Sequence, residues 1–125
     1  MINEISGAGL AYIGDAVIEL FIRERLVMAG GRIGELNKKA DEFGRAGYQS
    51  IAADRLEPLL TEEEAAAYRR GKNVHTNNLP KNATHAEYRK ATGLEALFGY
   101  LYISGEKERL SYLLEMGFFP EEKRD

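Results

Sequence analysis

The chain has 125 residues, 44% of them hydrophobic, and a formal net charge of −3, which suits one folded domain over residues 1–125 and excludes a disordered chain. It contains no cysteine, which excludes disulfide frameworks, thiolate zinc sites and cysteine nucleophiles. The stretch MINEISGAG lacks the features of a secretion signal, and no apolar run is long enough to cross a membrane. We therefore expect a cytoplasmic protein with no membrane partner.

Helical patterns predominate along the chain, beginning with a predicted helix over about residues 8–28. The pair Gly30-Gly31 follows it, and glycine commonly ends a helix. A second helical region is predicted over about residues 33–56 and ends at Pro58. Glycines within this region favour its division into two shorter helices. Its apolar positions recur near helical spacing: Leu36, Ala40, Phe43, Gly47 and Ile51.

Two capping boxes mark the starts of later helices. In each box a threonine is followed three residues later by a glutamate, so that side chains and backbone can cap one another. The box at Thr61 predicts a helix through about Gly71. The box at Thr84 predicts a long helix through about Ser104. Between these helices, the stretch KNVHTNNLPKNA is rich in asparagine and contains a proline, which predicts a loop.

A last helix is predicted over about residues 106–116, separated from the previous one by Gly105 and ended by Gly117. Phe118 and Phe119 follow it and are expected to pack against the core. Strand signals are sparse, and no Asn-Gly or Asp-Gly turn occurs. The sequence therefore predicts an all-α fold of six or seven helices.

Two of the most apolar helical segments each carry an acidic residue in their interior. LAYIGDAVIEL contains Asp15, and LEALFGYLYI contains Glu95 with Gly99 one turn further on, where the missing side chain lets a helix or ligand approach. An unpaired buried carboxylate costs several kcal/mol or becomes protonated. A divalent cation such as Mg²⁺ would stabilise two converging carboxylates. The pattern alone does not establish that these two residues meet.

Asp15, Glu19 and Arg23 recur every four residues and form one polar stripe on the first helix. For Glu19, this spacing favours a solvent-exposed ion pair with Arg23 over a role in a site.

Basic residues are concentrated in one part of the chain. The segment 69–90 carries six basic residues and one acidic residue, a charge of +5, on an otherwise acidic chain. This asymmetry predicts a basic face that binds a polyanion such as a nucleic acid. A solvated loop with charged flanks explains the same pattern about equally well.

Several motifs resemble those of one enzyme family. LAYIGDAVIEL resembles the signature helix of the ribonuclease III catalytic domain, and LEALFGYLY resembles the second acidic motif of that family. RRGKNVHTNNLPKNATHAEYRKATGLEALFGYL is similar to the corresponding stretch of the compact Mini-III ribonucleases, which consist of the catalytic domain without a double-stranded RNA-binding domain. The likeness runs in order over about residues 9–118.

The resemblance implies a Mg²⁺-dependent endoribonuclease that cleaves double-stranded RNA. It implies a homodimer in which the signature helices pack together and each subunit cuts one strand. Asp15 and Glu95 take the positions of the catalytic and metal-binding acids, with Glu19 as a candidate helper. For the compact group, it implies maturation of the large-subunit (23S) ribosomal RNA precursor, in contact with a ribosomal protein or a pre-ribosomal particle.

The sequence departs from the larger members of that family at three positions. Where those enzymes carry further acids, this chain has Ala8, Ala11 and Thr92, which reduces the expected metal ligands to Asp15 and Glu95. Two alternatives stay open. In the first, catalysis is lost and the chain is a double-stranded RNA-binding dimer. In the second, the chain is a structural helical dimer, with Asp15 and Glu95 far apart on different faces.

RNA contacts are expected in and before the predicted loop. Lysine and arginine neutralise phosphates, and asparagine can both donate to and accept from a ribose 2′-hydroxyl. For each asparagine, ordinary turn chemistry is the favoured interpretation, whereas for Lys72 and Lys81 contact with RNA is favoured. The candidate RNA-binding residues are Arg69, Arg70, Lys72, Asn73, Asn78, Lys81 and Asn82.

Overall fold

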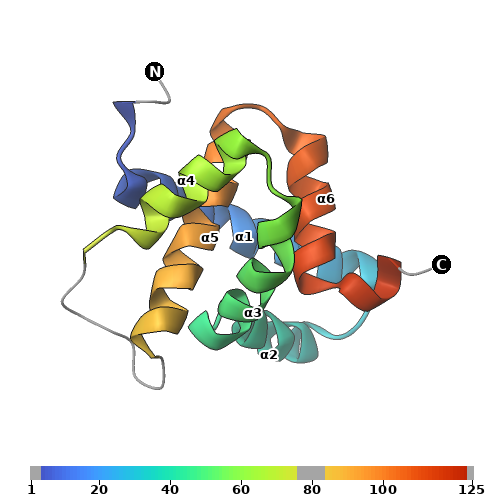
Figure 1. Ribbon diagram of the computed structural model, residues 1–125. Coiled ribbons are helices and arrows are strands. Elements are labelled where there is room, and N and C mark those ends of the chain that lie inside the picture. Colours follow the sequence, from blue (N-terminus) through green and yellow to red (C-terminus); the bar gives the residue numbers. More distant parts are fainter. Residues whose placement is uncertain (1–3, 76–83, 124–125) are drawn as a thin grey trace.

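Helices account for all the regular structure in the part of the chain that the computed structural model describes, residues 4–75 and 84–123 (Figure 1). The all-α prediction of six or seven helices is therefore confirmed. Short 3₁₀ turns occupy Glu57–Leu59 and Pro120–Lys123. The six α-helices are α1 (Gly7–Ala29), α2 (Ile33–Phe43), α3 (Ala46–Leu56), α4 (Glu62–Lys72), α5 (His85–Ile103) and α6 (Lys107–Phe118).

The centre of the fold is α5, which packs against α1, α3, α4 and α6. Figure 1 shows α5 crossing α1, with α4 and α3 beside it. Its apolar residues lie on every face, as expected of a helix surrounded by other helices. Leu94, Leu97 and Phe98 are completely buried. None of the described helices is long and apolar enough to cross a membrane.

Local capping signals explain where the helices begin and end. The Thr61 and Thr84 capping boxes both form, with threonine and glutamate side chains bonded to the backbone as predicted. The end of α1 is set by Gly30 and Gly31, whose φ angles of 92° and 124° lie where residues with a side chain are strained. The region 33–56 is divided into α2 and α3, which confirms the expected break.

Two details of the sequence interpretation are wrong. Gly117 lies inside α6 and does not end it. A Cβ atom there would lie 3.1 Å from Leu56 Cδ1, so Gly117 packs closely against α3. Ile51 is 51% exposed, whereas Gln49 and Ser50 are buried, because the break before α3 changes which face of the helix points inward.

An aromatic cluster fixes α2 and α3 against the end of α6. The rings of Phe43 and Tyr48 meet edge to face, 4.8 Å apart, and Tyr48 stacks on Phe118. Phe119 also contacts Phe43, so the expectation that both C-terminal aromatics pack is confirmed. The Tyr48 hydroxyl donates a hydrogen bond to the Phe118 carbonyl oxygen at 3.1 Å. This cluster holds α2 and α3 in the position from which they face α1.

Candidate active site

The site is built on an unusually close crossing of α1 and α5. A Cβ atom on Gly14 would lie 1.6 Å from the Glu95 carbonyl oxygen, and one on Gly99 would lie 2.0 Å from the Leu10 carbonyl oxygen. The two backbones therefore touch at reciprocal glycines, as the sequence led us to expect for Gly99. Because Asp15 follows Gly14 directly and Glu95 is the residue touched, the crossing brings the two acidic residues together.

The Asp15 and Glu95 carboxyl groups influence each other electrostatically. Glu95 is partly buried. This burial, together with the charge of Asp15 and hydrogen bonding to Asp15, raises the pKa of the Glu95 carboxyl group to about 8. Asp15 itself is exposed, so only Glu95 is withdrawn from solvent. This proximity excludes the structural-dimer alternative, which required the two acids to lie far apart.

The donor set fits a divalent cation held mainly by solvent and substrate. Two carboxylates that repel one another are suitable ligands for Mg²⁺, which commonly keeps several waters or phosphate oxygens. The two neighbouring positions at which larger family members carry acids, Ala11 and Thr92, provide no carboxylate ligand. Ala11 is buried, and the Thr92 hydroxyl donates to the Tyr88 carbonyl oxygen at 2.9 Å. No group of three or more potential ligands among histidine, cysteine, aspartate and glutamate occurs within the described residues.

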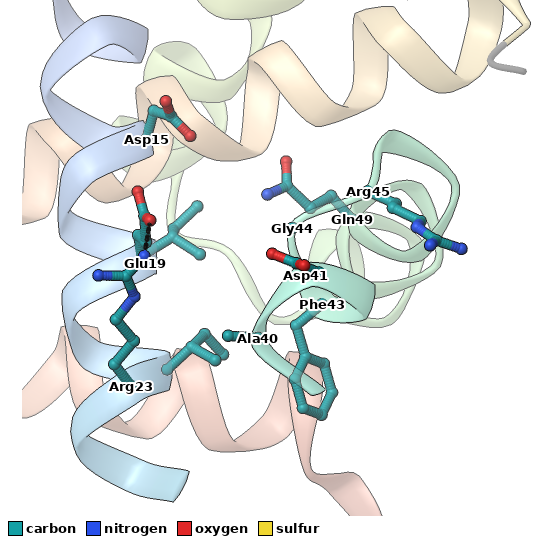
Figure 2. A pocket seen from close by; sticks show the side chains of 11 residues that line it. Asp15, Glu19, Arg23, Ala40, Asp41, Phe43, Gly44, Arg45 and Gln49 are labelled. Atoms are coloured by element: carbon teal, nitrogen blue, oxygen red, sulfur yellow. Dashed lines mark hydrogen bonds and ion pairs between the residues drawn. The ribbon is translucent and has the colours of Figure 1, made fainter. Parts of the chain in front are cut away.

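A pocket of about 470 Å³ opens beside Asp15 between α1 and the α2–α3 pair (Figure 2). Asp15, Glu19 and Arg23 lie along its α1 wall, and the opposite wall carries Asp41 and Gln49. Glu95 is not among its lining residues. The pocket is large enough for part of a nucleotide or for a hydrated ion beside the Asp15 carboxylate.

Glu19 lies one turn from Asp15 and pairs with Arg23, as the four-residue spacing predicted. Both side chains are more than half exposed, so this ion pair contributes little to stability. Glu19 also lines the pocket. Its helper role stays a prediction.

The basic residues that fall within the described chain occupy the end of α4. Arg69 is exposed, and Lys72 lies with its ammonium 5.2 Å from the Tyr68 ring centroid. Lys72 and Asn73 line a depression together with Arg89, His75 and His85. Arg70 donates to the Ile5 carbonyl oxygen, which gives it a structural contact as well. Asn78, Lys81 and Asn82 lie outside the described residues.

Sequence reasoning missed the α2–α3 wall of the pocket. Asp41 is one of many charged surface residues in the sequence, and nothing in its spacing relates it to Asp15. Gln49 falls beside Ser50 in a segment whose apolar spacing pointed to Ile51 as the inward position. Only the three-dimensional packing brings these side chains to the pocket.

Comparison with known proteins gives a consistent result. A family model of the ribonuclease III domain matches residues 8–106. The chain is 46% identical over 107 residues to a Mini-ribonuclease 3 of Symbiobacterium thermophilum, covering 85% of this chain and 82% of that protein. It is 40% identical over 115 residues to a Mini-ribonuclease 3 of Enterococcus faecalis, covering 90% and 87%.

A crystal structure of a protein from Fusobacterium nucleatum has the same fold, with a TM-score of 0.85 and 34% identity. The match covers 96% of this chain and 97% of that one. The sequence motifs, the helical architecture and these relatives agree over most of the chain. The chain therefore belongs to the ribonuclease III family, as an endoribonuclease of the Mini-ribonuclease 3 type.

Proposed function

We propose that this protein cleaves double-stranded RNA in a Mg²⁺-dependent reaction, with Asp15 and Glu95 as the catalytic and metal-binding residues. The observation that carries the proposal is the α1–α5 crossing, which brings two carboxyl groups together and raises the pKa of Glu95 to about 8. A chain that only bound RNA would have no use for this pair, since carboxylates repel phosphates.

Asp15 and Glu95 have different tasks in this proposal because their environments differ. Asp15 is exposed at the mouth of the pocket, where it can hold a cation and the phosphate that the cation accompanies. Glu95 is partly buried and fixed by the helix crossing, so it sets the geometry on the protein side. When bound there, Mg²⁺ would activate water for attack on phosphorus and stabilise the leaving oxygen. Glu19 lies one turn away and could accept a hydrogen bond from an ordered water.

RNA binding is proposed for the basic residues at the end of α4 and in the segment after it. The described candidates are Arg69, Arg70, Lys72 and Asn73, and the sequence adds Asn78, Lys81 and Asn82. A contact made to phosphates alone recognises shape and not sequence. We therefore expect Lys72→Ala to weaken binding similarly for duplexes of different sequence and to reduce its salt dependence, measured as Kd at several salt concentrations. A loss confined to particular sequences would contradict a phosphate contact.

A homodimer is proposed through the outer face of α1. Tyr12, Leu20 and Val27 are 84%, 62% and 55% exposed, although α1 is one of the most apolar helices of the chain. Apolar side chains gathered on one helix face are typical of a protein interface. The Mini-III likeness extends the proposal to a cytoplasmic enzyme that matures the large-subunit ribosomal RNA precursor in contact with a ribosomal protein or a pre-ribosomal particle.

The first experiment incubates purified protein with a long RNA duplex in Mg²⁺ or in EDTA, beside the Asp15→Asn and Glu95→Gln variants. We expect cleavage only by the wild type in Mg²⁺, with a loss of at least about 100-fold in each variant, since each removes a carboxyl group that would bind the cation. Duplex binding by the inactive variants shows that they are folded.

Equal cleavage by Asp15→Asn would contradict the proposed site and point to a contaminating nuclease. Duplex binding by the wild type without any cleavage would favour the alternative of a non-catalytic double-stranded RNA-binding dimer. In that case, the alanines and threonine at positions 8, 11 and 92 would explain the lost activity.

A further inference from the structure

Gln49 is a largely buried residue whose side-chain amide makes no hydrogen bond with the described residues. Its exposed fraction is 3%, and the residue lines the pocket beside Asp15. The amide atoms are not sealed inside the protein, since the Tyr68 hydroxyl alone is a fully buried side-chain group without a partner among the described residues. The amide is therefore held in place by the packing of α3 and is available to a molecule in the pocket.

The direction of the Gln49 amide indicates where its missing partner would lie. Gln49 lines the pocket beside Asp15, and Figure 2 shows its amide pointing from α3 towards the α1 side. It approaches from the wall opposite Asp15 and Glu19. A molecule in the pocket would thus meet carboxylates on one side and a neutral amide on the other.

The charged residues that line the pocket indicate which kind of chemical group Gln49 would bind. Three acids line it, Asp15, Glu19 and Asp41, whereas the Arg23 cation is paired with Glu19. In Figure 2 the Arg45 guanidinium points away from Asp15. Among the described residues that line the pocket, no cation is directed at a phosphate next to Gln49. A hydroxyl group fits better, since it is neutral and both donates and accepts, as the amide does.

We propose that Gln49 is a specificity residue that binds the 2′-hydroxyl of a ribose adjacent to the cleaved bond. The inference rests on the proposed function, because it takes the RNA backbone at Asp15 as the occupant of the pocket. The amide would accept from or donate to the hydroxyl while Asp15 and Glu95 act on the neighbouring phosphate. This contact lets the enzyme distinguish RNA from DNA at the site of reaction, since only RNA carries the hydroxyl.

The test is a double-mutant cycle in which one change is made in the protein and the other in the substrate. Gln49→Met keeps the size and flexibility of the side chain and removes its polar atoms. The substrate is a duplex with a fixed cleavage site, made either entirely of RNA or with a single 2′-deoxynucleotide, placed at each position near the cleaved bond in turn. Ser50→Ala is the matched control, because Ser50 is buried on the same helix but does not line the pocket. Cleavage rates, equilibrium Kd values in Ca²⁺ and thermal unfolding are measured for each pair.

We expect Gln49→Met to unfold at about the same temperature as the wild type, since the amide makes no hydrogen bond with the described residues and methionine has a similar size. Its kcat/KM on the all-RNA duplex should fall about 10-fold, the value of one hydrogen bond. For wild type, the 2′-deoxy change at one position should produce a similar loss. The two losses should not add, because each removes the same contact. Ser50→Ala should retain the wild-type discrimination between the two duplexes.

Two results would overturn the inference. If Gln49→Met cleaves and binds the all-RNA duplex like the wild type, the amide makes no contact with substrate. If the two losses simply add at every position, Gln49 does not bind a 2′-hydroxyl. A wild type that binds but does not cut would refute the proposed catalysis, and the Kd values would still decide whether Gln49 contacts the hydroxyl.

Discussion

The Tyr68 hydroxyl on α4 is a fully buried polar group without a partner among the described residues, whereas the Gln49 amide opens on the pocket. Tyr68 lines none of the pockets beside Asp15 or Lys72. Burial, with the nearby Glu57 and Asp54 charges, raises the pKa of Tyr68 to about 12, so the hydroxyl stays neutral. Its ring supports Lys72 and fills space beside Gly93. The aromatic ring of Tyr68, and not its hydroxyl group, therefore makes the stabilising contacts at this position.

We predict that Tyr68→Phe raises the free energy of unfolding by about 1 kcal/mol, because it removes an unpaired buried hydroxyl and keeps the ring. Urea unfolding at neutral pH measures the change. The matched control is Tyr48→Phe, which removes a hydroxyl that donates to the Phe118 carbonyl oxygen and should lower the free energy of unfolding by about 1 kcal/mol. A loss of stability in Tyr68→Phe would mean that its hydroxyl is paired.

At the scale of helices, the contact between α1 and α5 depends on glycines at positions 14 and 99. Gly14→Ala or Gly99→Ala would place a methyl group within 2.0 Å of a carbonyl oxygen on the other helix. The backbones would have to separate, and we predict a loss of about 3 kcal/mol or more in stability. Any folded fraction should also lose Mg²⁺-dependent cleavage, because separation moves Asp15 away from Glu95.

Gly34→Ala on α2 provides the control for helix propensity. A Cβ atom at Gly34 would meet nothing within 4 Å, so the same substitution should stabilise the protein by about 0.5–1 kcal/mol. Thermal unfolding of the three variants tests the argument. If Gly14→Ala and Gly34→Ala changed stability in the same direction, close packing at the crossing would not be the reason for the glycine.

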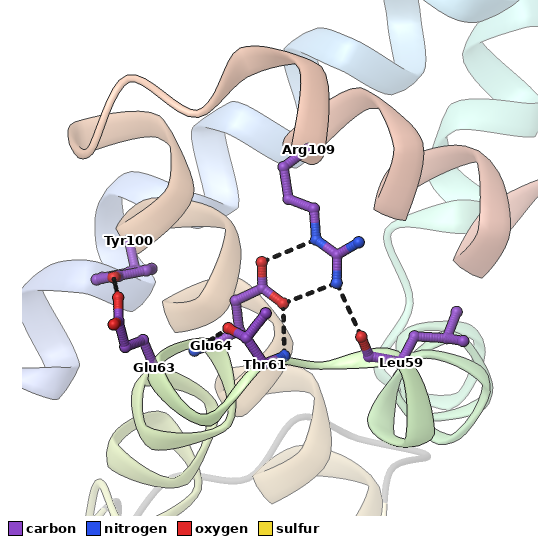
Figure 3. Close-up of polar contacts among 6 residues, drawn as sticks. All are labelled: Leu59, Thr61, Glu63, Glu64, Tyr100 and Arg109. Atoms are coloured by element: carbon purple, nitrogen blue, oxygen red, sulfur yellow. Dashed lines mark hydrogen bonds and ion pairs between the residues drawn. The ribbon is translucent and has the colours of Figure 1, made fainter.

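A buried ion pair connects α4 with α6 (Figure 3). Arg109 donates to both carboxylate oxygens of Glu64 at 2.9 Å, and it also donates to the Leu59 carbonyl oxygen. Glu64 is 5% exposed and accepts from the Thr61 backbone in the capping box. Burial acts to raise the pKa of Glu64, but the hydrogen bonds from Arg109 and Thr61 hold it below its usual value of 4.5.

The lowered pKa of Glu64 predicts how stability depends on pH. The ionised form is favoured in the folded state, so its stabilisation is fully present above about pH 4.5 and is lost as pH falls through the folded pKa. Glu64→Gln should lower stability by about 2 kcal/mol at neutral pH, since hydrogen bonds to a charged group become neutral ones. Below pH 4.5, the variant should lose stability less steeply than the wild type in urea unfolding. Parallel acid limbs in the two proteins would contradict this assignment.

For the molecule as a whole, sequence reasoning succeeded where the determining interactions are local. The Thr61 and Thr84 capping boxes and the glycines after α1 are set by residues within one turn of each helix end. It failed at Gly117, which lies inside α6 and packs closely against Leu56 on another helix, a contact that local sequence does not indicate.

The candidate site depends on contacts between residues distant in sequence, so only part of it could be predicted. Asp15 and Glu95 stood out because each interrupts an apolar helix, but only the resemblance to ribonuclease III indicated that they meet. The reciprocal contact of Gly14 and Gly99 is the physical cause of that meeting. The spacing of Gly99 from Glu95 indicated a close approach there, but it did not indicate that Gly14 is the partner. Gln49 could not be found from the sequence, since its importance comes from the absence of a partner in the folded state.

At the scale of the whole molecule, substitutions on the outer face of α1 test the proposed homodimer. Leu20 is 62% exposed on the face of α1 that also carries Tyr12 and Val27, and a charge there would be buried without a partner in the proposed dimer. We predict that Leu20→Glu converts a dimer into a folded monomer, measured by sedimentation velocity and circular dichroism. Ile51→Glu on α3, at a position 51% exposed, should leave the dimer intact.

The proposed dimer also predicts the form of the reaction products. If each subunit cuts one strand, a dimeric enzyme severs both strands of a fixed-site duplex in one encounter, whereas monomeric Leu20→Glu should give nicked duplexes first. Native gels at early times distinguish the two, because a nicked duplex keeps its length until it is denatured. A wild type that sediments as a monomer, or a Leu20→Glu variant that stays dimeric, would exclude this face of α1 as the interface. The exposed apolar residues of α1 would then need another explanation.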